Sequence, residues 1–280
     1  MGIKTKIEWC DSSVNPIMGC TGCTLREKHC YAAILCARYV GRKGWPKSFD
    51  EPEFFPGRLE KAVRWSALAG KPRPGKPWLN GLPRHIFVND LSDGFCPDVD
   101  PWQWLAPSIP SMHLSPHIWL LLTKWPDRMR QFFKEWNKPI PSNFYLGTTI
   151  TSADDLWRVG ELLQIQWAAV RFVSVEPMLG GVELPAEESF IDPDGFGWNG
   201  PMTTEMGNWS IDPDATIDWV ICGGESGPGA RPMHPDWARS LRNQCQAAGV
   251  AFFYKQAIIN GKKISCPELD GKQWREMPNV

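Results

Sequence analysis

Short apolar runs recur along the chain at residues 85–88, 118–122, 144–146, 170–175, 219–222 and 251–254. Each run is too short for a helix and too uniformly apolar for a strand with one face in water. Strands buried on both faces of a parallel sheet have this character. Most runs start about 26 to 33 residues after the previous one, which is the length of a strand and a helix. The chain is therefore expected to fold as a series of βα units.

Helix-compatible segments lie between these runs. Residues 126–136 begin with Pro in the first turn, and residues 235–248 end before Gly249, a favourable residue just beyond a helix. Further helices are expected at residues 152–163 and 58–68. With these helices, the βα pattern is present both before and after the longest gap between apolar runs, which lies between residues 175 and 219.

The predicted fold class is α/β, a full or partial (β/α) barrel with about six to seven parallel strands. One domain is expected to cover residues 1–280, with the first strand before Cys20. No Gly-x-Gly-x-x-Gly follows that strand, so an open dinucleotide-binding sheet explains the chain less well. Irregular insertions are expected at about 41–84 and 187–214, and the second should be a lid or substrate-facing loop because it interrupts the βα pattern.

Polar residues follow the apolar runs, and in βα barrels the active site forms at the carboxyl ends of the strands. A single polar residue there often only caps a helix or satisfies a loop. A whole set meeting on one rim indicates a site. The set consists of Asn89, Asp90, Lys124, Thr148, Thr149, Ser174, Glu176, Glu225, Lys255 and Gln256.

A glycine-rich turn at residues 223–232 contains Arg231. It could be a tight structural loop. It could also grip a carboxylate or phosphate with backbone amides and the guanidinium. The residues alone leave both interpretations open.

Cys20, Cys23 and Cys30 fall within eleven residues. Thiols this close, in a chain whose start lacks an apolar secretory segment, more often hold a metal than form disulfides. Three ligands leave one coordination position open for chemistry. Zinc would use His29 or Cys36 as a fourth ligand, whereas the position after the first strand favours an iron–sulfur cluster with one open iron.

Composition narrows the class of protein. With 42% hydrophobic and 22% charged residues, the chain can form a substantial core. It has no apolar run of about 18 residues, so no membrane span is expected, and a cytoplasmic location is predicted. The net charge of −1 excludes a strongly basic nucleic-acid coat but not a local basic groove. The 16 tryptophans serve core packing or stack on flat ligands.

The three cysteines after the first strand resemble the signature of radical S-adenosylmethionine (SAM) enzymes. More closely, the chain resembles the phage-encoded three-cysteine radical SAM-like proteins. The likeness is carried by residues 6–9, 15–20, 30–32, 87–93, 122–124, 174–177, 218–221, 223–232 and 252–256. One position departs from the family pattern, because the middle cysteine should stand seven residues after the first, where this chain has Glu27 and supplies Cys23 instead.

The resemblance implies a [4Fe–4S] cluster on Cys20, Cys23 and Cys30, with SAM bound at the open iron. It also implies an external electron donor such as flavodoxin. In this family the reduced cluster cleaves SAM, and the resulting 5′-deoxyadenosyl radical abstracts hydrogen from an unactivated carbon. The residues implied in cofactor binding are His29, Tyr31, Asn89, Asp90, Thr148, Thr149, Ser174 and Glu176. Those implied in catalysis on the substrate side are Lys124, Glu225, Arg231, Lys255 and Gln256.

The expected function is thus that of a radical SAM enzyme. A phage context suggests an isomerase that rearranges an amino-acid adduct of thymine in DNA, acting in the host cytoplasm. The alternative is a zinc-stabilised nucleic-acid-binding or nuclease-like protein. A third possibility is a barrel that has kept the geometry of a SAM site and lost catalysis. Metal analysis separates the first two, and SAM cleavage separates the first from the third.

Overall fold

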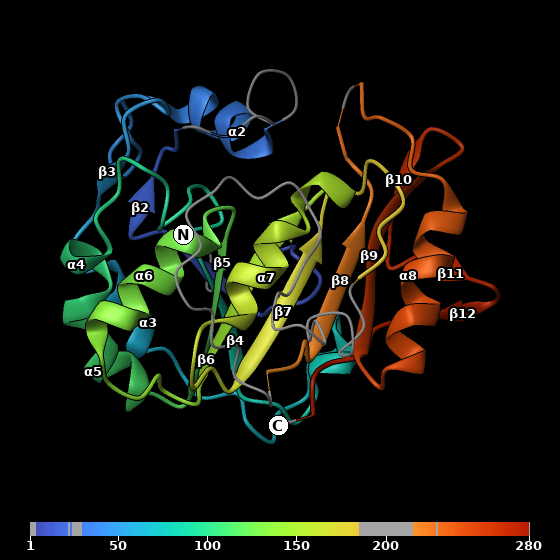
Figure 1. The fold of residues 1–280 in the computed structure, drawn as a ribbon. Coiled ribbons are helices and arrows are strands. Elements are labelled where there is room, and N and C mark those ends of the chain that lie inside the picture. The colour runs from blue at the N-terminus through green and yellow to red at the C-terminus, as the bar shows by residue number, and fades with distance from the viewer. Residues whose placement is uncertain (1–3, 22, 24–29, 185–214, 228, 280) are drawn as a thin grey trace, which may run out of the picture.

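A computed structural model describes residues 4–21, 23, 30–184, 215–227 and 229–279, and within them the main element is an eight-stranded sheet (Figure 1). Its order is β1-β4-β5-β6-β7-β8-β9-β10, and all neighbours are parallel except β9 and β10. The strands are β1 (Ser12–Val14), β4 (Arg84–Val88), β5 (His117–Thr123), β6 (Phe144–Ile150), β7 (Val170–Val175), β8 (Trp219–Gly223), β9 (Ala251–Ile259) and β10 (Lys262–Ser265). Two small sheets pair β2 (Ile17–Met18) with β3 (Glu53–Phe54) and β11 (Glu268–Leu269) with β12 (Lys272–Gln273).

Helices cover the outer face of the curled sheet (Figure 1). The described α-helices are α2 (Tyr31–Tyr39), α3 (Arg58–Val63), α4 (Pro101–Trp104), α5 (Ile109–His113), α6 (Pro126–Trp136), α7 (Trp157–Leu163) and α8 (Pro235–Ala247), with 3₁₀ turns η1 (Pro77–Leu79), η2 (Ala106–Ser108) and η3 (Ala153–Asp155). Helices α6 and α7 pack side by side, and α8 packs on β8 and β9. Helix α2 differs from these, because it lies above the carboxyl ends of the strands (Figure 1).

The strands are buried on both faces because two apolar clusters lie on opposite sides of the sheet. Alternate side chains of β4 to β9, such as Phe172, Trp219 and Phe253, form an inner cluster with Trp9. The intervening side chains, such as Val173 and Val220, face the helices and form the larger outer core. This arrangement explains why the strands are continuous apolar runs rather than alternating ones.

The inner cluster depends on one complementary pair of small and large residues. Gly147 of β6 faces the ring of Phe172 on the neighbouring β7, and a Cβ added to Gly147 would lie 2.5 Å from that ring. Phe172 has no exposed surface. A glycine is therefore required at this position for the interior to close around the aromatic ring.

The sheet forms an open half-barrel, since no strand pairing among the described residues joins β1 to β10. Side chains fill this seam. The ring of Trp9 packs 4.7 Å from that of Phe87, centroid to centroid, and Trp78 makes an edge contact with Phe253 at 5.9 Å. The turn that carries Trp9 thus completes the inner core where the sheet stays open.

The predicted partial βα barrel agrees with this sheet, but the sheet has more strands than the six to seven expected. The additional strand is β10, which folds back antiparallel on β9. The helix expected at 58–68 ends at Val63, because Arg64 and Trp65 make tighter backbone bonds to residues three positions earlier. The helix expected at 152–163 begins only at Trp157, after η3.

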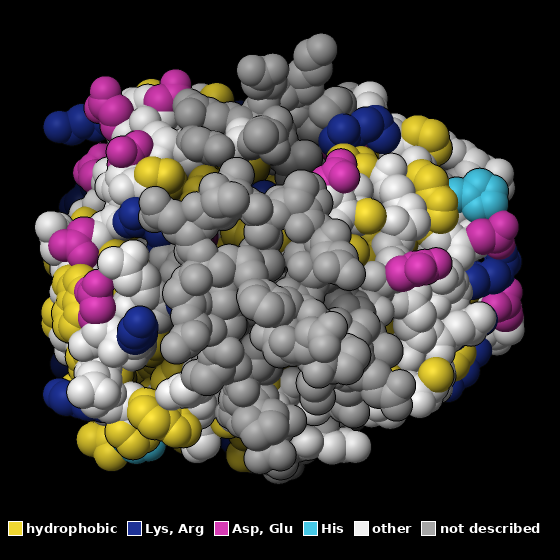
Figure 2. Space-filling view, viewed as in Figure 1, with side chains coloured by type: hydrophobic (Ala, Val, Ile, Leu, Met, Phe, Trp, Pro, Cys, Tyr) yellow, Lys and Arg dark blue, Asp and Glu magenta, His cyan; other side chains and the backbone are white. Residues whose placement is uncertain are grey.

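The surface of the described residues shows no single-sign charge patch on the face seen in Figure 2, where acidic and basic side chains are intermixed. Among the described helices, none is long and apolar enough to cross a membrane. The segment predicted as a lid, 187–214, lies outside the described residues. Its role therefore stays a prediction.

Candidate functional site

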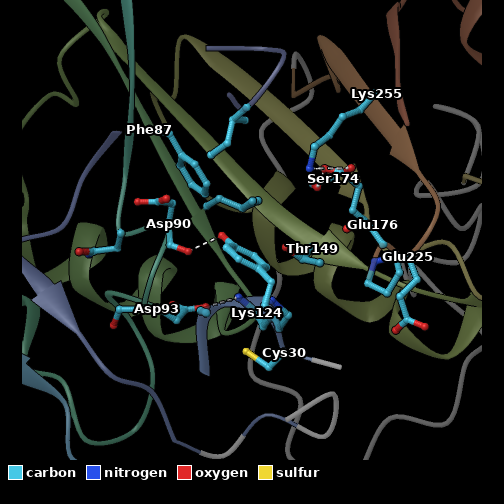
Figure 3. A pocket seen from close by; sticks show the side chains of 18 of the residues that line it. Cys30, Phe87, Asp90, Asp93, Lys124, Thr149, Ser174, Glu176, Glu225 and Lys255 are labelled. Atoms are coloured by element: carbon cyan, nitrogen blue, oxygen red, sulfur yellow. Dashed lines mark hydrogen bonds and ion pairs between the residues drawn. The ribbon is translucent and has the colours of Figure 1, made fainter. Parts of the chain in front are cut away.

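A cavity of about 410 Å³ opens at the carboxyl ends of the parallel strands. Its size lies in the range of small-molecule sites. Most of the residues predicted from the sequence line it, as Figure 3 shows in part. These are Cys20, Cys23, Cys30, Tyr31, Asn89, Asp90, Lys124, Thr149, Ser174, Glu176, Glu225, Lys255 and Gln256.

The backbone before the first cysteine is fixed by tight contacts. Gly19 has φ of +95°, and a Cβ there would lie 2.9 Å from the carbonyl oxygen of Phe49. The Cys20 amide donates to that same oxygen at 2.8 Å, and the Gly19 amide donates to Leu91. Gly19 is therefore needed to bring Cys20 to the rim of the sheet.

The three cysteines share the cavity but are not assembled as a metal site. Within the described residues, no three His, Cys, Asp or Glu side chains are placed together to hold a metal ion. A hydrogen bond with the Cys96 thiol, together with burial, raises the pKa of Cys20 well above its usual value. A thiol binds a metal as the thiolate, so metal binding by Cys20 would release its proton.

A hydrogen-bonded network holds the end of β4. Asn15 donates to Asp90 at 2.6 Å and accepts from the Leu91 amide at 3.0 Å. Asn89, in the left-handed region at φ +64°, accepts from the Ile17 amide at 3.0 Å. Burial raises the pKa of Asp90. Asn89 thus organises the loop, whereas Asp90 presents a carboxylate to the cavity (Figure 3).

A second carboxylate, Asp93, was missed by the sequence prediction. It accepts from the Thr123 hydroxyl at 2.6 Å and from the Lys124 and Phe95 amides at 2.8 and 3.0 Å. Burial raises its pKa. Asp93 lies only three residues after Asp90, so its place near the same strand end could have been predicted from the sequence. Asp93 fixes the turn that carries Lys124 at the cavity wall.

An ion pair joins Glu176, the residue after β7, to Lys255 of β9 in the cavity lining. The Lys255 ammonium lies 3.0 and 3.2 Å from the two oxygens of Glu176, and the Ser174 hydroxyl donates to Glu176 at 3.2 Å. Figure 3 shows these three side chains converging. A Cβ at Gly223 would lie 2.4 Å from Glu176. The glycine therefore leaves the space that the carboxylate occupies.

The glycine-rich turn carries a second ion pair. The Arg231 guanidinium donates to both oxygens of Glu225 at 3.0 and 2.7 Å, and the Arg231 amide donates to the same group at 2.8 Å. Glu225 is buried and lines the cavity, whereas Arg231 does not line it. Gln256 donates to the Gly224 carbonyl at 2.8 Å. The turn is thus held from within, and the guanidinium of Arg231 pairs with Glu225.

Two further predicted residues do not join the cavity lining. Thr148 has no exposed surface, and its hydroxyl donates to the Thr123 carbonyl at 3.0 Å. It alternates with Thr149, so only one of the pair can face the cavity. His29 lies outside the described residues. The prediction also missed Glu8, Trp9 and Lys263, which line the cavity from distant parts of the chain.

A smaller polar cavity of about 230 Å³ adjoins the cysteine segment. Cys23 and Lys124 line both cavities. The remaining walls of the smaller one come from the turn after β6, where Arg158 pairs with Asp155 at 2.9 Å. The two cavities are therefore neighbours that meet at Cys23 and Lys124.

Comparison with known proteins identifies a family. Residues 4–278 match a family described as a protein of unknown function, DUF5131. No curated protein and no solved structure matches the chain. Because the match covers almost the whole sequence, the chain belongs to the DUF5131 family.

Proposed function

We propose that this protein is a radical SAM enzyme. The observation that supports the proposal is the convergence of Cys20, Cys23 and Cys30 on one cavity at the carboxyl ends of a curled parallel sheet. Three thiols among buried carboxylates and hydroxyls suit an iron–sulfur cluster with a small polar ligand.

The donor types fit the cluster, because three thiols line one cavity together with carboxylates and hydroxyls. Cys20, Cys23 and Cys30 would hold the cluster. When bound, the reduced cluster and SAM together supply a carbon radical that removes hydrogen from the substrate.

The chain's own residues bind and orient the two ligands. Asp90 and Glu176 provide carboxylates for the SAM ammonium, and Thr149 and Ser174 provide hydroxyls for its ribose and carboxylate. Thr149 and Ser174 are buried and Asp90 and Glu176 partly buried, so a ligand that displaces water here needs such a partner for each of its polar groups. Lys124 serves the substrate side, together with Lys255 and Gln256. The proposed substrate is an amino-acid adduct of thymine in DNA, which the enzyme would rearrange as an isomerase, with a flavodoxin-like donor supplying the electron.

Metal analysis after anaerobic purification tests the cluster. The wild type should carry iron and sulfide near four per chain. Serine at Cys20, Cys23 or Cys30 should lower both contents severely. Cys245→Ser is the matched control, because Cys245 is buried but does not line the cavity. Zinc in place of iron, or full iron content in all three variants, would overturn the proposal.

SAM binding and cleavage test the roles of the lining residues. Asp90→Ala and Glu176→Ala should keep their iron but bind SAM about 10-fold more weakly or worse, because each loses a charged hydrogen bond. Lys124→Ala should still cleave SAM but should no longer form the product. Wild-type SAM affinity and turnover in all three variants would show that these residues only cap the strands.

A further inference from the structure

A turn rich in exposed cations begins in the last part of helix α2. Residues 38–47, here called the basic turn, contain no acidic residue. Even with the two acidic residues at positions 50 and 51, the segment 38–51 keeps a charge of +2, in a chain whose net charge is −1. The turn has four exposed cations, none of which forms an ion pair with another described residue: Arg38, Arg42, Lys43 and Lys47. The basic turn is therefore a concentrated and exposed positive surface.

A second group of exposed cations lies on β10 and in the segment before β1. Lys262 and Lys263 are exposed on β10, and Lys6 is exposed in the N-terminal segment. The Glu8 carboxylate accepts from the Ser265 hydroxyl at 2.5 Å, so the N-terminal segment runs beside β10. The contact between Glu8 and Lys263, at 3.8 Å, is a long ion pair with an exposed partner and holds Lys263 only weakly. These three lysines are here called the β10 group.

The basic turn and the β10 group stand on different sides of the cavity. Lys6 and Lys263 of the β10 group line it directly. On the other side, helix α2 begins at Tyr31, which also lines the cavity, and its nine residues at about 1.5 Å each span roughly 14 Å. In Figure 1, α2 lies above the carboxyl ends of the strands, and the hairpin of β9 and β10 rises to the right of it. The mouth of the cavity therefore has exposed cations on both sides.

The interior of the cavity has a different charge character. Among the described residues, five carboxylates belong to its lining: Glu8, Asp90, Asp93, Glu176 and Glu225. They outnumber the two less exposed lysines of the lining, Lys124 and Lys255. A negative group is therefore attracted to the rim rather than to the interior. An uncharged planar ring can enter the cavity and pack on aromatic side chains of its lining such as Phe87 and Trp125.

We propose that a single-stranded polynucleotide binds across the mouth of this cavity. Its phosphates contact the basic turn on one side and the β10 group on the other, and one base between them enters the cavity. A duplex fits less well, because its bases are stacked inside and one must first be extruded. The inference rests on the proposed function only in taking this cavity as the substrate site. It names a polymer strand, rather than a free nucleotide, as the substrate class.

Fluorescence anisotropy on the whole purified chain tests the proposal. The probe is a labelled oligothymidylate of about 12 nucleotides, a length typical of single-strand sites. Each phosphate contact contributes about −0.7 to the slope of log affinity against log salt for a single strand. The four cations of the basic turn and the three of the β10 group predict a slope of up to about −5. No measurable binding at about 50 mM salt, or binding that does not depend on salt, would overturn the proposal.

Variants separate the contributions of the two groups. The first variant combines Arg38→Gln, Arg42→Gln, Lys43→Gln and Lys47→Gln, and its slope should be less negative than that of the wild type by about 2.8. Between about 50 and 200 mM salt, this difference corresponds to a loss of affinity that is about 50-fold smaller. The second variant combines Lys6→Gln, Lys262→Gln and Lys263→Gln and should change the slope by about 2.1. An effect of only one of the two variants would show that the strand does not cross the mouth.

A matched control removes the same charge elsewhere on the surface. It replaces by glutamine four exposed cations that do not line the cavity: Lys61, Arg64, Lys71 and Lys134. The slope should change by less than about 0.7, which is less than one phosphate contact. A change as large as that of the basic-turn variant would mean that the strand only responds to the charge of the whole protein, and the proposed surface would be refuted.

Two competitors test whether the base is needed. One is a duplex of the same sequence, and the other is an oligomer of the same length that keeps the phosphates but lacks the bases. Each should compete at least about 10-fold more weakly than the single strand, because the first must extrude a base and the second has none to stack in the cavity. Equal competition by either one would contradict the placement of a base inside the cavity.

Failure of this inference can be distinguished from failure of the iron–sulfur proposal. The anisotropy does not depend on turnover, and the iron content of each preparation is measured separately. Strand binding that is lost with the basic turn in a protein without iron would support the inference while the radical SAM proposal fails. Iron binding and SAM cleavage without strand binding would have the opposite meaning.

Discussion

The unpaired indole nitrogen of Trp9 leads to a stability prediction that needs no ligand. Trp9 and Trp119 are both fully buried, but their indoles differ in hydrogen bonding. Trp119 donates to the Met112 carbonyl and to the Ser115 hydroxyl, at 3.0 Å each. Trp9 donates to no described residue. Phenylalanine at the two positions therefore removes similar volume but different numbers of hydrogen bonds.

The magnitudes follow from these differences. Replacing Trp by Phe removes roughly 40 Å³, which at about 24 cal/mol per Å³ costs about 1 kcal/mol at either site. Trp119→Phe also loses the hydrogen bond that its single N–H shares between the two oxygens, worth about 1 kcal/mol. We expect Trp9→Phe to lower the free energy of unfolding by about 1 kcal/mol and Trp119→Phe by about 2 kcal/mol.

Urea unfolding followed by circular dichroism measures both values under one set of conditions. The slope of free energy against urea should be the same in both variants, because the surface exposed on unfolding hardly changes. A Trp9→Phe cost equal to or above that of Trp119→Phe would show that the Trp9 nitrogen has a partner.

Two other predictions concern the sheet. Gly147→Ala should cost about 1–3 kcal/mol, because its Cβ would meet the buried Phe172 ring. Gly160→Ala, in α7 with open space around it, should instead stabilise by about 0.5–1 kcal/mol, and the opposite order in urea unfolding would contradict this packing. Burial lowers the pKa of His85 to about 4, below its unfolded value of about 6.5. The stability that neutral His85 contributes is therefore present above pH 6.5 and is lost as the pH falls toward 4, by on the order of 3 kcal/mol. In the wild type, the urea midpoint should therefore fall as the pH is lowered from 6.5 to 4. His85→Gln should show a smaller fall over this range, and an equal fall in the variant would show that other groups cause the loss of stability.

The sequence predicted those elements whose signals are local. The strand at 170–175 and the helix at 126–136 have the predicted bounds, because a buried parallel strand is a continuous apolar run and Pro marks a first helical turn. Strand β9 continues past its apolar run through Lys255 and Gln256, where the composition alone favours a loop. The Asn260-Gly261 pair, with φ of +51° and +73°, was a usable hairpin signal.

The site was predictable only in its strand-end half. Polar residues after parallel strands must meet on one rim, and most of those predicted do line the cavity. Glu8 and Trp9 could not be found in this way, because they lie in a turn before β1. Their place depends on the open seam of the sheet, which no local pattern encodes. The prediction for Thr148 was wrong because side chains alternate along a strand, so that Thr148 points away from the cavity that Thr149 lines.

The bond between Glu8 and Ser265 joins residues 257 positions apart. A ribosome makes Glu8 early and Ser265 late, and at about 5–20 residues per second the interval between them is roughly 10–50 seconds. During this time the inner aromatic cluster lacks the strand that carries Phe253. The nascent chain therefore presents an unfinished apolar interior, which is a surface that chaperones bind. The part of the cavity wall that Glu8 and Lys263 form is among the last parts of the molecule to be completed during synthesis.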